Sequence, residues 1–172
     1  MCWWKKQKAK TRTALTPGSY VSLPYPEEKP DHIKNKGNTT ADDAKKIFFE
    51  WMTTYLVPLE KTKWWEKVKI TLDESTVAAT DSKHKHMWIS PVWLNPGVIA
   101  HEMAHISYWQ LSPEKKRRFE ASYQATTEPL VLLVKKERTY AETSMVETHA
   151  EIYRFLGKYM PESFWEFYPF LF

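Results

Sequence analysis

The chain has 172 residues, a net charge of +4 and a single cysteine. This length suits one domain with its own core. One cysteine excludes an internal disulfide, and no apolar run approaches the roughly 18 residues that a membrane span needs. Basic residues gather at 5–12 and 115–118, but the mild overall charge favours solvated surface, with no nucleic acid expected as a partner. The N-terminus lacks the apolar segment of a signal peptide, so we expect a cytoplasmic protein unless a leader was removed or secretion uses no cleaved signal.

The first 39 residues are expected to form an extended N-terminal arm, followed by a single domain over residues 40–172. The arm is rich in Lys, Pro and Asn, and its Pro-containing segments at 16–18 and 23–26 favour turns and extended chain. Thr40 with Asp43 can cap the first helix of the domain. Apolar residues then recur at helical spacing up to Pro58 and are assigned to the core: Ala44, Ile47, Phe48, Trp51, Met52, Tyr55 and Leu56.

Residues 64–90 change to the two-residue period of β-strands. Two segments alternate in this way, Val68 to Leu72 and His86 to Ser90. We therefore expect a small mixed sheet ahead of the next helix, with an edge strand that can pair antiparallel with an extended peptide. His84 and His86 lie two residues apart, but nothing nearby completes a metal site, so they are interpreted as surface residues.

The motif H-E-x-x-H follows, at His101-Glu102-Met103-Ala104-His105. Asn95 is expected to cap a helix with Pro96 at its first position. Residues four apart on a helix share a face, so His101 and His105 can present two imidazole nitrogens to one Zn2+. Glu102, about 100° further round, can reach a water on the metal and act as general base. Because the helix looks buried, where unpartnered polar groups cost several kcal/mol, metal binding is favoured over a solvated helix face. The pattern indicates peptide-bond hydrolysis.

The third ligand is not fixed by this motif. The residues after His105 offer neither the Gly nor the His of a metzincin site. The charged run 112–120, with Ser112 as N-cap and Pro113 at the first helical position, is most simply a solvated helix. Glu128 precedes Pro129, which disfavours a helix at that residue, so it could bind a metal only from a loop.

Glu147 and Glu151 form a second pair four residues apart. They lie in a helix-compatible stretch from Ala141 to Leu156, which Gly157 and then Pro161 end. One carboxylate can bind zinc while the other accepts a hydrogen bond from the outer nitrogen of a ligand His, which fixes the tautomer. His149 points away from both and is interpreted as a surface or core residue. Glu151, Glu128 and His149 therefore remain alternatives to Glu147 as third ligand.

The segment Glu147-Thr148-His149-Ala150-Glu151 resembles the second zinc-binding helix of gluzincins, in the branch of anthrax lethal factor and the bacterial Pro-Pro endopeptidases. In that branch the third ligand is a Glu roughly forty residues after the second His, and a Tyr two helical turns earlier stabilises the tetrahedral intermediate. Here Glu147 lies forty-two residues after His105 and seven after Tyr140. The resemblance covers about the C-terminal half. It implies His101, His105 and Glu147 as zinc ligands, Glu102 as base, Tyr140 as oxyanion donor and Glu151 as the carboxylate behind a ligand His.

The aromatic segment 160–172 is expected to pack on the body behind this second helix, with binding of a partner as the alternative. Together these features predict an α+β, zincin-like domain with an edge strand beside the active-site helix and a mainly helical C-terminal half. The predicted function is a zinc metallopeptidase acting on peptide or protein substrates through metal-activated water. The alternative is a catalytically silent module with structural zinc that binds a peptide or partner. Glu102 favours the enzyme, because a structural site needs only ligands.

Overall fold

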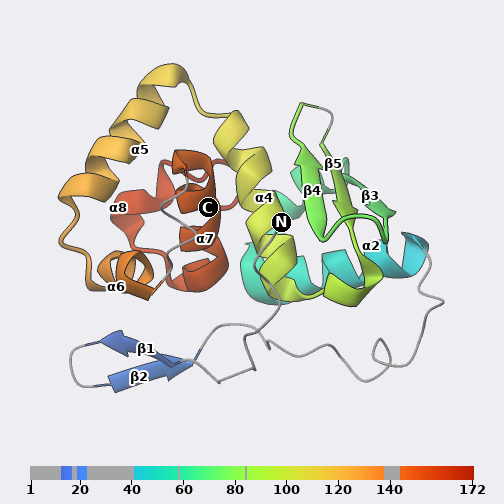
Figure 1. The fold of residues 1–172 in the computed structure, drawn as a ribbon, viewed down its shortest axis with the longest axis horizontal. Helices are drawn as coiled ribbons and strands as arrows, with labels where there is room; N and C mark the ends of the chain where they lie inside the picture. The colour runs from blue at the N-terminus through green and yellow to red at the C-terminus, as the bar shows by residue number, and fades with distance from the viewer. Residues whose placement is uncertain (1–12, 17–18, 23–40, 58, 84, 138–143) are drawn as a thin grey trace.

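A small sheet and a larger set of helices make up the protein, so the expected α+β class is confirmed (Figure 1). The computed structural model describes residues 13–16, 19–22, 41–57, 59–83, 85–137 and 144–172. In Figure 1 the sheet and α2 lie to one side of α4, and the helices of the C-terminal half lie to the other. The helices are α2 (Ala41–Trp51), α3 (Thr62–Trp65), α4 (Pro96–Trp109), α5 (Pro113–Ala125), α6 (Pro129–Glu137), α7 (Met145–Leu156) and α8 (Glu162–Trp165). Shorter helical turns are η2 (Met52–Leu56), η3 (Leu59–Lys61), η4 (Pro91–Trp93) and η6 (Gly157–Tyr159).

The sheet is mixed and has the order β3-β5-β4. Strand β3 (Lys69–Leu72) runs parallel to β5 (His86–Ile89), and β4 (Ala78–Asp81) runs antiparallel to β5. Two of these strands follow the predicted alternating segments, whereas β4 was not expected from the sequence. One face of the sheet carries the buried side chains of Ile70, Met87 and Ile89. Because side chains alternate between the two faces of a sheet, Thr80, which pairs with Met87, belongs to the same buried face.

The apolar stripe of the first helix packs into the core as predicted. Its described members Ala44, Ile47, Phe48, Trp51, Met52 and Leu56 are all buried. The helix changes to a π-helical turn at Met52, and the backbone N–H of Val57 closes that turn by donating to the carbonyl of Met52 at 2.9 Å. The predicted cap at Thr40 lies outside the described residues. Helix α2 thus covers the buried side of β3 and also touches α4.

Helices α4 and α7 pack against one another and form the centre of the molecule. The expected cap of α4 is present, since the Asn95 side chain accepts a hydrogen bond from the backbone N–H of Val98 at 3.0 Å, with Pro96 at the first position. The expected end of α7 before Gly157 is also present. Its start differs from the prediction. Ser144 is extended and caps α7, which begins at Met145, so no helix runs unbroken from residue 141.

The aromatic C-terminal segment packs against the body, as predicted from its composition. Phe164, Phe167, Tyr168 and Leu171 are buried in the common core. The tail is also tied by hydrogen bonds, because Ser107 of α4 donates to the carbonyl of Pro169 at 2.8 Å. Residues 160–172 therefore form a layer behind α4 and α7.

Within the predicted arm, β1 (Thr13–Thr16) and β2 (Ser19–Ser22) pair antiparallel. Strand β1 lies against α6. The other residues before Ala41 lie outside the described residues, and the boundary between arm and domain at residue 39 stays a prediction. Across the residues described, no helix has the length and apolar character required to span a membrane.

Candidate metal centre

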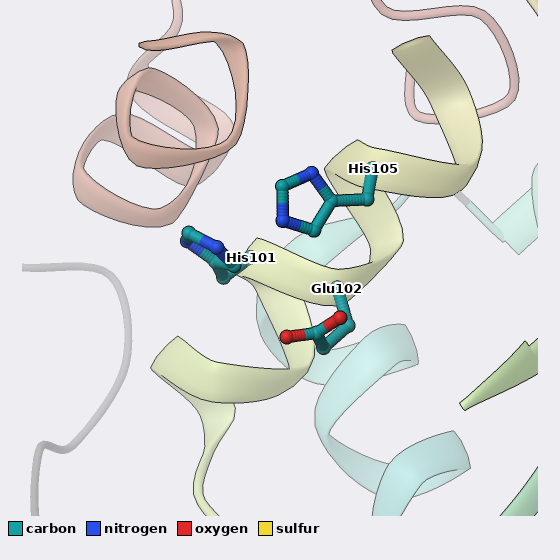
Figure 2. Close-up of side chains that lie close together, drawn as sticks. All are labelled: His101, Glu102 and His105. Carbon is teal, nitrogen blue, oxygen red and sulfur yellow. The ribbon is translucent and has the colours of Figure 1, made fainter. Parts of the chain in front are cut away.

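Two histidines and a glutamate from α4 form the centre of the candidate site. His101 and His105 are one turn apart, and Glu102 follows His101 directly (Figure 2). The centroids of the His101 and His105 imidazole rings lie 4.6 Å apart. His101 and Glu102 are buried, with 6% and 5% of their surfaces exposed, and His105 is half-buried. Donor atoms of the three residues lie within 4.8 Å of one another, so among the described residues this group could hold a metal ion.

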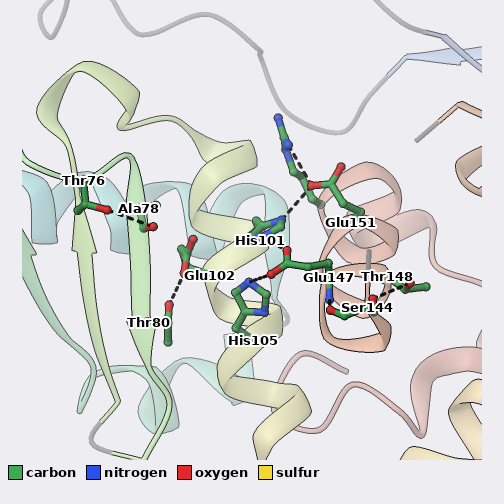
Figure 3. Close-up of polar contacts among 11 residues, drawn as sticks. Thr76, Ala78, Thr80, His101, Glu102, His105, Ser144, Glu147, Thr148 and Glu151 are labelled. Atoms are coloured by element: carbon green, nitrogen blue, oxygen red, sulfur yellow. Dashed lines mark hydrogen bonds and ion pairs between the residues drawn. The ribbon is translucent and has the colours of Figure 1, made fainter. Parts of the chain in front are cut away.

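Glu147, from the first turn of α7, faces both imidazoles. Its two carboxylate oxygens lie 3.2 Å from Nε2 of His101 and 3.7 Å from Nε2 of His105. Figure 3 shows this carboxylate between α7 and the two imidazoles of α4. Ser144 caps the start of α7 and so fixes the position of Glu147, because its hydroxyl accepts a hydrogen bond from the Glu147 backbone N–H at 3.3 Å. The first turn of a helix also favours a negative charge.

Glu151 lies one turn further along α7 and contacts the other nitrogen of His101. Its Oε1 is 2.9 Å from Nδ1 of His101 and 3.0 Å from Nη1 of Arg154, and only 2% of Glu151 is exposed. A carboxylate in this place accepts the Nδ1–H, which leaves the lone pair of Nε2 directed at Glu147 and the centre of the site. Arg154 was missed from the sequence, although its position three residues after Glu151 on a helix is a common ion-pair spacing.

Thr80 was also missed. Its hydroxyl, on edge strand β4, donates a hydrogen bond to Oε2 of Glu102 (Figure 3). The two residues are 22 positions apart, and nothing in the local sequence links them. Burial raises the pKa of Glu102, while the nearby His101 and the hydrogen bond from Thr80 lower it to a smaller extent.

A cavity of about 290 Å³ opens beside these groups. It lies between β4, α4 and the start of α7, and its walls are mostly apolar apart from the His and Glu cluster. Trp109, two turns beyond His101 on α4, lines it with 59% of its surface exposed, and the Lys116 ammonium lies 4.7 Å from one of its ring centroids. The lining residues are Val77, Ala78, Ala79, Thr80, Val98, His101, Glu102, His105, Trp109, Val146 and Glu147.

The charges of the site favour a bound cation. Burial lowers the pKa of His101, but hydrogen bonds to Glu147 and Glu151 and the charges of Glu151 and Glu102 together raise it more, to about 9. Burial and the neighbouring His101 lower the pKa of His105 to about 4. In the metal-free site the proton on His101 and the guanidinium of Arg154 offset part of the charge of the three carboxylates. A divalent cation could replace that proton, because a metal binds the neutral imidazole, so the donor set fits a metal ion.

The alternative third ligands lie elsewhere. Glu128 accepts a hydrogen bond from the Ser163 hydroxyl at 3.0 Å. His149 is fully buried behind α7, where its Nε2 lies 2.6 Å from the carbonyl of Phe167 and its ring stacks on Tyr168 at 3.9 Å. Burial lowers the pKa of His149 to about 3, so the neutral ring donates from Nε2 to that carbonyl. His149 is thus a core residue, one of the two interpretations offered by the sequence.

Tyr140, the predicted oxyanion donor, lies outside the described residues. Seven residues amount to two helical turns only if one helix joins Tyr140 to Glu147, and no single helix does so, because Ser144 is extended and α7 begins after it. The role of Tyr140 stays a prediction that now rests on the family resemblance alone.

The basic run 115–118 is largely engaged within the molecule. Arg118 forms a 2.6 Å ion pair with Glu166, and Lys115 donates to the carbonyl of the same residue at 3.3 Å. The Lys116 ammonium lies over the rings of Tyr108 and Trp109. These contacts agree with the interpretation of the run as an ordinary charged helix surface.

No family model matches the chain, and no curated protein or solved structure matches it at a significant level. The resemblance to gluzincins therefore stays a prediction from the sequence motifs.

Proposed function

We propose that this protein is a zinc metallopeptidase in which His101, His105 and Glu147 hold the metal and Glu102 is the general base. The observation that carries the proposal is the convergence of two helices. Glu147 of α7 faces the Nε2 atoms of both histidines of α4, while Glu102 lines the same cavity from the next position on α4. A purely structural metal site would not need the Glu102 carboxylate beside its three ligands.

The spacing of the donor atoms suits zinc. Ligands bound tetrahedrally at about 2.1 Å lie roughly 3.4 Å from one another. The two distances from Glu147 oxygens to imidazole nitrogens, 3.2 and 3.7 Å, bracket that value. Two imidazoles and one carboxylate are a ligand set of catalytic zinc sites, which keep a fourth position open. Zinc bound there would act as a Lewis acid toward a peptide carbonyl.

The chain's own groups would then handle the protons. Glu102 would accept a proton from the attacking water as the oxygen of that water joins the carbonyl carbon. The carboxylic acid would return the proton to the departing amine nitrogen when the C–N bond breaks. Glu151 would keep the Nδ1 proton on His101, and the ion pair with Arg154 would hold the Glu151 carboxylate in place.

A peptide substrate is supported by strand β4. Within the described residues, β4 pairs with β5 along one edge and with no strand along the other. It lines the cavity beside Glu102, and an extended peptide commonly binds by adding a strand to such an edge. The scissile bond would then lie next to the general base.

The test is peptide-library cleavage by the wild type and by Glu102→Gln, with metal content measured on both proteins. We expect one zinc per chain in each, cleavage by the wild type alone, loss of cleavage with a chelator and its return with zinc. The amide of the variant cannot accept the water's proton, so a fall of several orders of magnitude is expected. Equal cleavage by both proteins would refute the mechanism. Peptide binding without cleavage by either would establish the silent binding module instead.

A further inference from the structure

The hydroxyl of Thr80 and the carboxylate of Glu102 link the edge strand to the helix that bears the proposed base. Thr80 lies on the face of β4 that is turned to the core, in register with the fully buried Met87 of β5. From this position its hydroxyl donates to Oε2 of Glu102 (Figure 3). The contact joins two elements that both line the cavity.

Glu102 depends on this hydrogen bond more than a surface carboxylate would. Only 5% of the residue is exposed, and a buried carboxylate needs donors to replace the water that it loses. Within the described part of the chain, the Thr80 hydroxyl is the one hydrogen-bond donor to Glu102. The bond engages one of the two carboxylate oxygens and leaves the other to a group bound in the cavity.

We propose that Thr80 is a positioning residue, which holds the Glu102 carboxylate in the orientation needed for proton transfer and so ties that orientation to the edge strand. The proposal rests on the proposed function, because it assigns the alignment of that base to β4. A peptide paired with β4 would steady the strand and, through Thr80, the base. Alignment of the base would then be best when the substrate is in place.

Two substitutions separate positioning from simple structural support. Thr80→Val keeps the shape of the side chain and removes the donor, whereas Thr80→Ser keeps the donor and removes a methyl group. Thr71→Val is the matched control, because Thr71 is also a half-buried Thr of this sheet with a side-chain hydrogen bond, to His86 at 2.8 Å, and it lies away from the cavity.

The experiment measures kcat, KM, zinc content and melting temperature for these variants, together with crystal structures of the zinc-loaded proteins. We expect Thr80→Val to lower kcat about 10- to 100-fold, the usual effect of a misplaced catalytic group, with KM and zinc content nearly unchanged. Thr80→Ser and Thr71→Val should keep kcat within a few-fold of the wild type. In the crystal structures Glu102 should hold one orientation in the wild type and in Thr80→Ser, and more than one in Thr80→Val.

The outcomes distinguish this inference from the proposed function. Cleavage that depends on Glu102, combined with a normal kcat in Thr80→Val, would overturn the positioning role and leave the peptidase intact. A lower melting temperature of Thr80→Val with a normal kcat would show that Thr80 only stabilises the fold. If the wild type cleaves no peptide, the proposed function fails. The crystal structures of Thr80→Val still test whether Thr80 orients Glu102, because a single unchanged orientation of Glu102 would refute positioning.

Discussion

The raised pKa of His101 predicts that the metal-free protein loses stability at alkaline pH. The pKa is about 9 in the folded protein and 6.5 for an ordinary histidine. A raised folded pKa contributes stability that is fully present below pH 6.5 and is lost as the pH rises through about 9. The difference of about 2.5 units, at 1.36 kcal/mol per unit, corresponds to roughly 3 kcal/mol. His101 is only 6% exposed, so solvent screens little of this contribution.

Other groups of the site do not reverse the effect in this range. His105 and His149 have lowered pKa values, about 4 and about 3, so their contributions change below pH 6.5. The pKa of Glu102 is raised, which makes its contribution fall with rising pH as well. Zinc binds neutral imidazole, so the zinc-loaded protein should not show the loss.

Urea unfolding of chelator-treated protein between pH 6 and 9.5 measures this prediction. We expect the free energy of unfolding to fall by a few kcal/mol across that range in the metal-free wild type. The fall should be absent in His101→Gln and retained in His86→Gln, a histidine of β5 away from the cavity. A metal-free wild type of constant stability from pH 6.5 to 9 would refute the charge arrangement described for the site.

Four further substitutions test individual side chains. Glu147→Ala should abolish stable zinc binding, and full zinc occupancy in this variant would move the ligand role to another residue. Glu151→Gln should weaken zinc affinity by about 10- to 100-fold, as measured by competition with a chelator. Trp109→Ala should lower kcat/KM about tenfold for peptides with a bulky apolar residue at the cleavage site, with less effect on matched peptides that carry Asp there; an equal effect on both would remove Trp109 from the substrate site. Tyr140→Phe should lower kcat about 10²-fold with zinc content and melting temperature unchanged, and a lower melting temperature with normal kcat would instead indicate a core tyrosine.

Local rules were sufficient for the helix that carries the motif. The cap at Asn95, the proline after it and the spacing of His101 and His105 are all properties of short sequence windows, and the structure has α4 where they place it. The start of α7 was also encoded locally, because Ser144 and Glu147 have the spacing of a capping box. Continuous helix propensity back to Ala141 obscured that signal, so the helix was expected to begin before Ser144.

The strand that completes the site could not be found in the same way. Residues 78–81, Ala-Ala-Thr-Asp, have low β-propensity and a weak alternation of apolar and polar residues. They form a strand because β5 offers them a hydrogen-bonding edge and α4 covers one face. The contact between Thr80 and Glu102 depends on that tertiary arrangement, so no sequence window contains it.

The layer formed by residues 160–172 has a consequence for the order in which the site is assembled during synthesis. Glu147 and Glu151 lie on α7. On the rear face of this helix, His149 contacts Phe167 and Tyr168, and Tyr153 contacts Tyr168. The nascent chain thus displays both histidines of α4 well before the residues that support the opposing carboxylates have emerged. A metal captured at that stage would have only the ligands of α4. In the proposed centre, Glu147 would complete the ligand set only once residues 160–172 have packed behind α7, so metal binding would report on the folding of this segment.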